Sequence, residues 1–202
     1  MSLIDYHFAF PGRPLPSVDE HKMLDYVTAA NGVYARGRRP GLEVCMPVSF
    51  NLQGIRGLVP VASYAQWGFP KVTADVLLNV LRISRHQCRR EPKEALFYFR
   101  FDGSWRAEYP KQVATADTVI ADEGVDSSDV IIELHSHHSM AAEFSHTDNA
   151  DESQGFRVYA VIGTIFDRPT INARIGLWGH FFPYPASEFF DMPEELADAI
   201  AA

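Results

Sequence analysis

The sequence predicts an α/β protein of the α+β type, and three observations support this. Residues 72–89 have apolar residues at helical spacing, whereas most other apolar runs are short and alternate as strands do. Asp102-Gly103 and Asp167-Arg168-Pro169 each separate two such runs, as turns between antiparallel strands do. Residues 130–134 are rich in β-branched side chains and predict a buried strand. Together these patterns favour a β-sheet with few helices.

Length and composition are those of an ordinary globular chain. The 202 residues are 47% apolar and 22% charged, which predicts one domain with an extension. The net charge of −8 is uneven, because residues 1–112 hold 15 Lys+Arg and 10 Asp+Glu, whereas residues 113–202 hold 3 and 16. This acidic half favours a basic partner and disfavours nucleic acid. No apolar run approaches the roughly 18 residues of a membrane span, so we expect no membrane partner. Cys45 and Cys88 lack metal-site spacing, and we expect both to be reduced thiols in a cytoplasmic protein.

Residues 1–69 predict an N-terminal extension of strands and one short helix that packs on the core. Residues 18–30 have the apolar spacing of a short helix ended by Asn31-Gly32. Three further segments predict strands, the last two joined as a hairpin at Gln53-Gly54: residues 32–36, 42–52 and 55–61.

The long helix leads into a strand that begins with a glutamate. Thr73 is a plausible N-cap for residues 72–89, arginines favour the C-terminal end, and Pro92 ends the helix. Residues 94–101 and 104–109 predict a hairpin around Asp102-Gly103, so Glu94 opens its first strand.

The second half predicts a short helix, two core strands and a tail. Gly155 can close the helix that residues 150–154 complete, and residues 156–166 and 170–178 are apolar enough for core strands. Residues 187–202 predict an acidic C-terminal tail in which Pro193 starts a short helix.

A His-x-His pair at the end of the buried strand predicts a metal site. Side chains alternate along a strand, so His135 and His137 face the same side, about 6.5 Å apart along it. Ser145 at a helix N-cap would place Asp148 in the first turn, facing the same end. Two imidazoles and one carboxylate are the three protein ligands of a catalytic zinc site that leaves the fourth position to water.

Each half of this pattern has another interpretation. Ser-x-x-Asp is also an ordinary capping pattern, and His-x-His can be structural. A cupin-like site would need Gly where the chain has Asp129, and a glutamate closer to the second histidine than Glu143. The combined spacing therefore favours a bound metal.

The pattern His135-x-His137-x7-Ser145-x2-Asp148 resembles the signature of the JAMM (MPN-plus, Mov34/PAD-1) metalloproteases. The stretch that leads into Glu94 is similar to the family's Pro-x-Glu pattern. The resemblance implies a JAMM/MPN-like central mixed β-sheet flanked by helices over residues 70–186. It implies Zn²⁺ held by His135, His137 and Asp148, with Glu94 as general acid/base and Ser145 donating to the carbonyl oxygen. The implied activity is cleavage of peptide or isopeptide bonds after the tail of a ubiquitin-like protein.

The residues leave some alternatives open. Glu133 lies on the same strand face as His135 and is the competing base. His138 stands where the family usually has proline, as a spare ligand, a substrate contact or an exposed side chain. A non-catalytic MPN-type binding module and a zinc hydrolase of a small amide or thiol conjugate are the alternative functions.

Residues 181–185 and the long extension also resemble the JAMM protein of the bacterial PRTRC cassette. That resemblance implies two partners. One is a ubiquitin-like protein or its conjugate as substrate, and the other is a ThiF-like adenylating protein.

Overall fold

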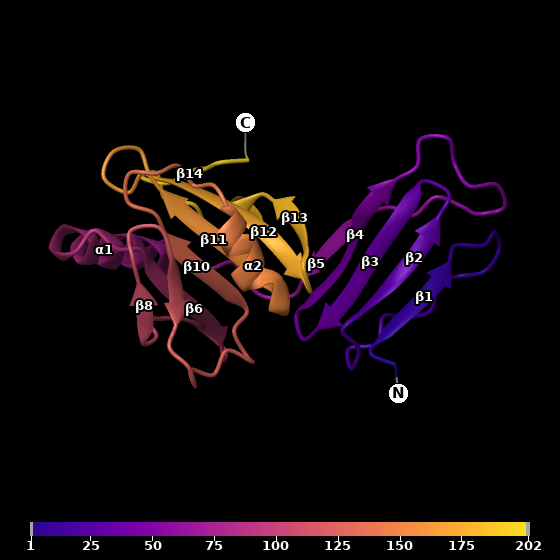
Figure 1. Cartoon of the computed structure of the whole chain (residues 1–202), viewed down its shortest axis with the longest axis horizontal. Helices are drawn as coiled ribbons and strands as arrows, with labels where there is room; N and C mark the ends of the chain where they lie inside the picture. Colours follow the sequence, from indigo (N-terminus) through magenta and orange to yellow (C-terminus); the bar gives the residue numbers. More distant parts are fainter. Residues whose placement is uncertain (1, 201–202) are drawn as a thin grey trace. The chain divides into compact units, whose positions relative to one another are not determined.

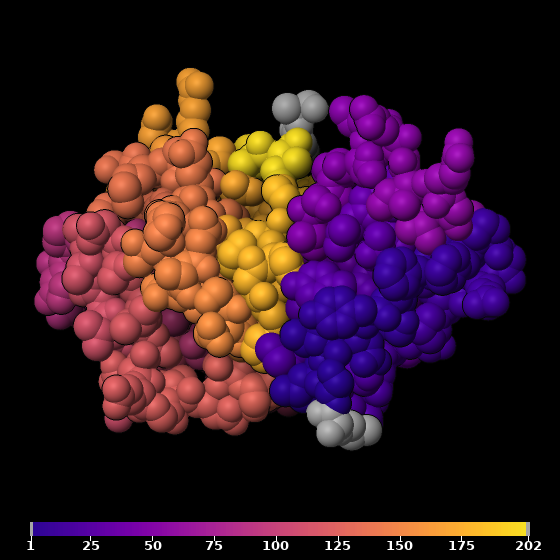
Figure 2. Space-filling model, turned by 45° about the vertical axis from the view of Figure 1, so that its right-hand side comes forward, coloured from indigo at the N-terminus to yellow at the C-terminus, as the bar shows by residue number. Residues whose placement is uncertain are grey.

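A computed structural model of the chain describes residues 2–200 and divides it into two compact units, Met1–Phe69 and Pro70–Ala202. Strands form most of each unit, with few helices, so the predicted α+β class is confirmed (Figure 1). Each unit is a continuous packed body in the space-filling view (Figure 2). Among the described residues, no helix combines the length and apolar character needed to cross a membrane.

The first unit is a five-stranded sheet. Only its first pair of strands is parallel, and the strands follow the chain order: β1 (Ile4–Phe8), β2 (Leu24–Ala29), β3 (Gly32–Arg39), β4 (Leu42–Phe50) and β5 (Tyr64–Trp67). One side of the sheet buries Val27, Ala29, Tyr34 and Cys45 in a small core. Cys45 and Cys88 are both free thiols, as predicted.

Two predictions for this unit are wrong. The predicted helix at residues 18–30 is replaced by strand β2, whose Tyr26, Val27 and Thr28 favour strands. Hydrogen bonding to β1 on one side and β3 on the other outweighs the weak helical spacing. The predicted strand at residues 55–61 is irregular, and β4 pairs with β5 instead.

The second unit contains a seven-stranded mixed sheet in the order β13-β12-β11-β10-β6-β7, with β14 beside β12. Its strands are β6 (Ala95–Phe101), β7 (Trp105–Glu108), β10 (Ile132–Ser136), β11 (Phe156–Gly163), β12 (Thr170–Leu177), β13 (His180–Tyr184) and β14 (Ala197–Asp198). A separate ribbon is formed by β8 (Gln112–Ala114) and β9 (Val119–Ala121). Strand β10 is parallel to β11 and antiparallel to β6. The hairpin around Asp102-Gly103 and the two core strands are confirmed.

The helices of this unit are α1 (Ala74–Arg90), α2 (His146–Asp151) and the 3-10 helices η1 (Glu152–Gln154) and η2 (Ala186–Glu188). Helix α1 confirms the long predicted helix and packs against β6 and β7. Thr73 occupies its N-cap position without a side-chain hydrogen bond.

The helix predicted to start at Pro193 is absent from the described residues. A 3-10 turn ends at Glu188, and β14 then pairs with β12. Phe189 and Phe190 are buried in the second unit, and Phe190 forms a β-bridge with Val72. Burial of these rings fixes the segment in place without a helix.

Candidate metal centre

Strand register brings the glutamate and the two histidines to the same end of the sheet. Ser136 of β10 pairs with Ala95 of β6, so the next residues along, His137 and Glu94, stand at the same level. The backbone N–H of His137 also donates to the Ile162 carbonyl of β11, which extends the strand pairing by one residue. Residues that are far apart in the sequence therefore meet because the strands are antiparallel.

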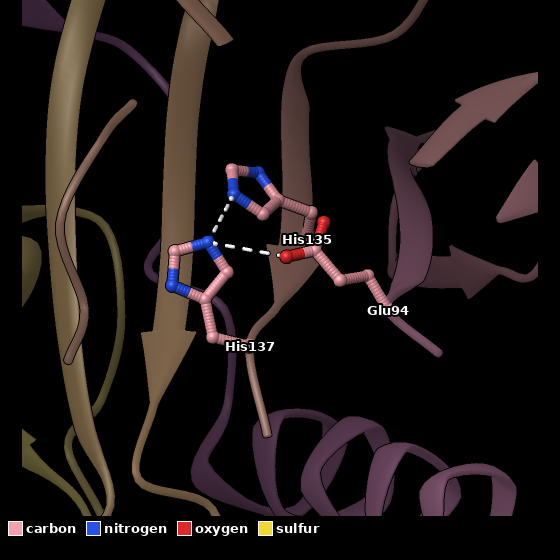
Figure 3. A group of neighbouring side chains, drawn as sticks. All are labelled: Glu94, His135 and His137. Atoms are coloured by element: carbon pink, nitrogen blue, oxygen red, sulfur yellow. Dashed lines mark hydrogen bonds and ion pairs between the residues drawn. The ribbon is translucent and has the colours of Figure 1, made fainter. Parts of the chain in front are cut away.

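Three buried side chains converge there (Figure 3). Their ligand atoms all lie within 4.8 Å of one another. Nε2 of His135 lies 3.3 Å from Nε2 of His137, and Oε1 of Glu94 lies 3.5 Å from the latter. Only 2% of Glu94, 5% of His135 and 6% of His137 is exposed. A buried set of two imidazoles and one carboxylate could hold a divalent metal ion.

The hydrogen bond of His137 indicates which ring nitrogen is free to bind an ion. Its Nδ1 lies 2.8 Å from the carbonyl oxygen of Ala141, so a neutral ring donates Nδ1–H there. Nε2 then presents a lone pair toward His135. Fixing one ring nitrogen on a carbonyl oxygen is the common way to orient a metal-binding histidine.

Helix α2 brings a second carboxylate to the histidines. Ser145 caps this helix, and its Oγ accepts from the Asp148 N–H at 3.1 Å. Oδ2 of Asp148 accepts from the Ser145 N–H at 2.6 Å, which completes the predicted capping box. Oδ1 is left to face His135, 3.7 Å from its Nε2. The cap therefore orients Asp148 toward the site.

Burial and nearby charges shift the pKa values of these groups. Burial lowers the pKa of His135 to about 4, although Asp148 opposes this shift. Burial also acts to raise the pKa of Asp148, but His135 and the hydrogen bonds from Ser145 outweigh it and lower that pKa overall. The pKa of Glu94 rises to about 8 through burial, with smaller contributions from Asp148 and Asp117. Without a cation, this site favours a neutral His135 and a protonated Glu94.

Comparisons with known proteins assign no family to the chain. No family model matches it, and no curated protein matches it. Among solved structures, the chain is similar to the solution structure of protein DSY2949 from Desulfitobacterium hafniense, at 17% identity and a TM-score of 0.40. That match covers 61% of this chain and 92% of the other. A likeness at this level says nothing about activity.

A cavity of about 250 Å³ opens beside His137 and Ser145. Its lining includes the apolar side chains of Met140 and Phe144 and the carboxylates of Asp117 and Glu143. Sequence reasoning missed Asp117, which lies in the turn between β8 and β9 and raises the pKa of Glu94. No spacing signal could have found it, because a short ribbon outside the main sheet brings it to the site.

The structure does not bring the other candidate residues to the site. Glu133 lies two residues before His135 on β10, and its Oε2 forms an ion pair with Nη1 of Arg157 at 3.0 Å. His138 is half-buried, and its Nε2 has no hydrogen-bond partner among the described residues. His146 is exposed in the first turn of α2. Glu94, His135 and His137 thus form the cluster without them.

A second group in the first unit could hold a metal ion by distance alone: Asp5, His7 and Asp25. Its carboxylates already have cationic partners. Lys22 contacts Asp5, and Arg36 contacts Asp25 at 2.9 Å. We therefore interpret this group as an ion-pair network and place the candidate metal centre in the second unit.

In metal-free protein, Glu94 is expected to contribute a loss of stability as pH rises from about 4.5 to about 8, whereas the lowered pKa of His135 acts in the opposite direction between about 4 and 6.5. Glu94 in the folded chain keeps its proton up to about 8, whereas the unfolded chain releases it near its ordinary pKa of 4.5. The difference lowers the free energy of unfolding by about 1.4 kcal/mol per pH unit across that range. Glu94→Gln removes this dependence. Denaturant titrations with a chelator, from pH 5 to 8, should give curves that diverge between wild type and variant. Parallel curves would contradict the expectation.

Proposed function

We propose that the chain is a zinc-dependent metallopeptidase or isopeptidase of the JAMM type. The observation that carries this proposal is the convergence of Glu94 with the two imidazoles at a buried strand end. Oε1 of Glu94 is buried and has no hydrogen-bond partner among the described residues. A buried carboxylate oxygen without a hydrogen bond is costly unless an ion or a water molecule completes its environment.

The ligand set fits zinc. His135 and His137 offer two facing Nε2 atoms, and Asp148 offers Oδ1. Imidazole nitrogen with one carboxylate oxygen is a donor set typical of catalytic zinc. When bound there, zinc would supply a water of lowered pKa and a Lewis acid for the substrate carbonyl.

Glu94 is the proposed general acid/base. Burial raises the pKa of Glu94 to about 8 in the metal-free site, and a bound zinc ion would lower it again toward neutrality, where a carboxyl group can both accept and return a proton. Glu94 would take the proton of the attacking water at one carboxylate oxygen and deliver it to the leaving amine. Glu133 is less suited to this role, because Arg157 already binds its carboxylate.

Ser145 is the proposed donor to the carbonyl oxygen of the substrate. Its Oγ accepts the Asp148 N–H, and this leaves the hydroxyl hydrogen available to donate. Ser145 also lines the cavity beside His137, where a substrate carbonyl could lie. A donor fixed by its own cap can stabilise charge that develops on that oxygen.

Ser145→Gly is expected to lower turnover about 100- to 1000-fold, because the donor is lost. Glycine at an N-cap costs only a few tenths of a kcal/mol, so α2 should remain folded. Ser145→Thr keeps both cap and hydroxyl and should retain most activity. Turnover and thermal stability are measured for both variants. A Ser145→Gly variant with wild-type turnover would rule out the donor role.

We propose a ubiquitin-like protein, or its conjugate, as the substrate, and a ThiF-like adenylating protein as a functional partner. The motif spacing around His135, His137, Ser145 and Asp148 supports this substrate class, since the same spacing occurs in the JAMM enzymes. The two free thiols favour a cytoplasmic location, which is part of the same proposal.

Metal analysis combined with a cleavage assay tests the proposal. Full-length protein is expected to bind one zinc ion and to cut a ubiquitin-like protein fused to a short peptide, or joined to lysine, after its C-terminal tail. Mass spectrometry of the products identifies the bond that is cut. Zinc binding without cleavage of either substrate would favour the binding-module alternative, and absence of zinc would refute the metal centre.

A further inference from the structure

A buried arginine lies on the sheet face that carries the histidines. Arg174 of β12 pairs with Tyr159 of β11, which pairs with Glu133 of β10, two residues before His135. Because side chains alternate along strands, Arg174 shares the face of Glu133 and His135. Only 6% of Arg174 is exposed. A buried guanidinium needs strong compensating contacts, and those contacts indicate its role.

The guanidinium binds the C-terminal end of α2 and the turn that follows it. Nε and Nη2 donate to Oε2 of Glu152, at 3.0 and 2.5 Å. Nη1 donates to Oδ1 of Asn149 at 2.5 Å. The hydroxyl of Tyr159 adds a hydrogen bond to the Glu152 carbonyl at 3.0 Å.

The same guanidinium also contacts the residue that precedes the N-cap of α2. It lies between two rings, 3.8 Å from the centroid of Phe144 and 3.9 Å from that of Phe181. Phe144 stands directly before Ser145. Its ring packs edge-on against the imidazole of His135, with ring centroids 6.2 Å apart. One side chain therefore touches both ends of α2.

Helix α2 depends on such external contacts. It has six residues, and none of these is buried. A helix this short is not stable alone, and it has no buried face to dock on the sheet. Its position nevertheless determines whether Asp148 faces His135, because both cap hydrogen bonds move with the helix.

We infer that Arg174 is a positioning residue, which holds α2 so that Asp148 and Ser145 face the histidines. This inference rests on the proposed zinc function. Arginine suits the role because its planar fork can bind Glu152 and Asn149 while its faces stack on two rings. Lysine keeps the charge, but its ammonium group cannot bind Glu152 and Asn149 with a planar fork or stack flat on the two rings.

The decisive variant is Arg174→Lys, with Arg157→Lys as its matched control. Arg157 is a half-buried arginine on the same sheet face that binds Glu133 and the Ser127 carbonyl. Since the hydrogen bonds of Arg157 run to Glu133 and Ser127 and not to α2, replacing it should disturb the sheet but not the position of α2. Three quantities are measured for wild type and both variants: zinc affinity by chelator competition, the Co²⁺ absorption spectrum, and amide hydrogen exchange of residues 145–151 without metal.

Arg174→Lys is expected to weaken zinc binding about 10- to 100-fold, the range typical of residues that orient ligands. It should also change the Co²⁺ spectrum and speed exchange in α2, whereas Arg157→Lys should leave all three near wild type. Wild-type affinity, spectrum and exchange in Arg174→Lys would overturn the inference, as would equal effects of Arg157→Lys.

Where Arg174→Lys fails to fold, the double variant Arg174→Met/Glu152→Gln is judged by the same criteria. Its second substitution replaces the Glu152 carboxylate, which loss of Arg174 would leave buried without its partner. Failure of the proposed function looks different from failure of this inference. A wild-type protein that binds zinc but cuts neither substrate, with α2 loosened only in the Arg174 variants, would reject the peptidase and keep the positioning role.

Discussion

Glu94→Gln is expected to abolish cleavage while zinc remains bound, and His137→Ala is expected to lose both. The amide is close to the carboxyl group in size and can keep its place at the strand end, but it cannot take a proton. Loss of a general base typically costs about 10²- to 10⁴-fold. His137→Ala removes an Nε2 atom that lies 3.3 Å from that of His135, so the ligand set is broken. Single-turnover cleavage and metal content are measured side by side.

Glu133→Gln is the matched control for this pair. Glu133 lies on the same face of β10 as the histidines, but its carboxylate is bound by Arg157. We expect this variant to keep its zinc and most of its activity. Cleavage that survives in Glu94→Gln but is lost in Glu133→Gln would identify Glu133 as the general base. Cleavage lost in both variants would contradict the assignment of this role to Glu94 alone.

The convergence of the candidate metal ligands could be predicted in part because some of their positions follow local rules. Alternation along β10 places His135 and His137 on one face, and the Ser145–Asp148 capping box depends only on a three-residue spacing. Glu94 could be predicted only through the resemblance to the JAMM pattern, because a glutamate at the start of a strand is usually an ordinary surface residue. Its contact with His137 depends on the register of β6 against β10, which no local pattern specifies.

The residues around the centre could not be predicted because they depend on tertiary structure. Arg174 looks like an ordinary member of a core strand, and only the pairing of β12 with β11 brings it under α2. Residues 18–30 show the opposite failure. Their weak helical spacing is real, but hydrogen bonding to β1 and β3 determines that β2 is a strand.

Phe190→Ala is expected to destabilise the second unit by about 3–5 kcal/mol, the typical cost of removing a fully buried ring. Phe190 is 1% exposed and packs edge-on against Phe99 of β6, with ring centroids 6.1 Å apart. Glu94 stands one residue before β6, so loosening this strand should also weaken zinc binding. Exchange of the β11 amides, which report unfolding of this unit alone, gives the free energy.

Phe166→Ala is the control, because Phe166 belongs to the same unit and is 47% exposed. Removing it forfeits the contact with Arg89 and little else, so the cost should stay below about 1 kcal/mol. A small effect at Phe190 would mean that the segment after η2 contributes little to the fold. A large effect would mean that this segment belongs to the structural core, since Phe190 bridges to Val72 just before α1 and contacts the strand that follows α1. The rigidity of the strand end that carries Glu94 would then depend on both ends of the second unit.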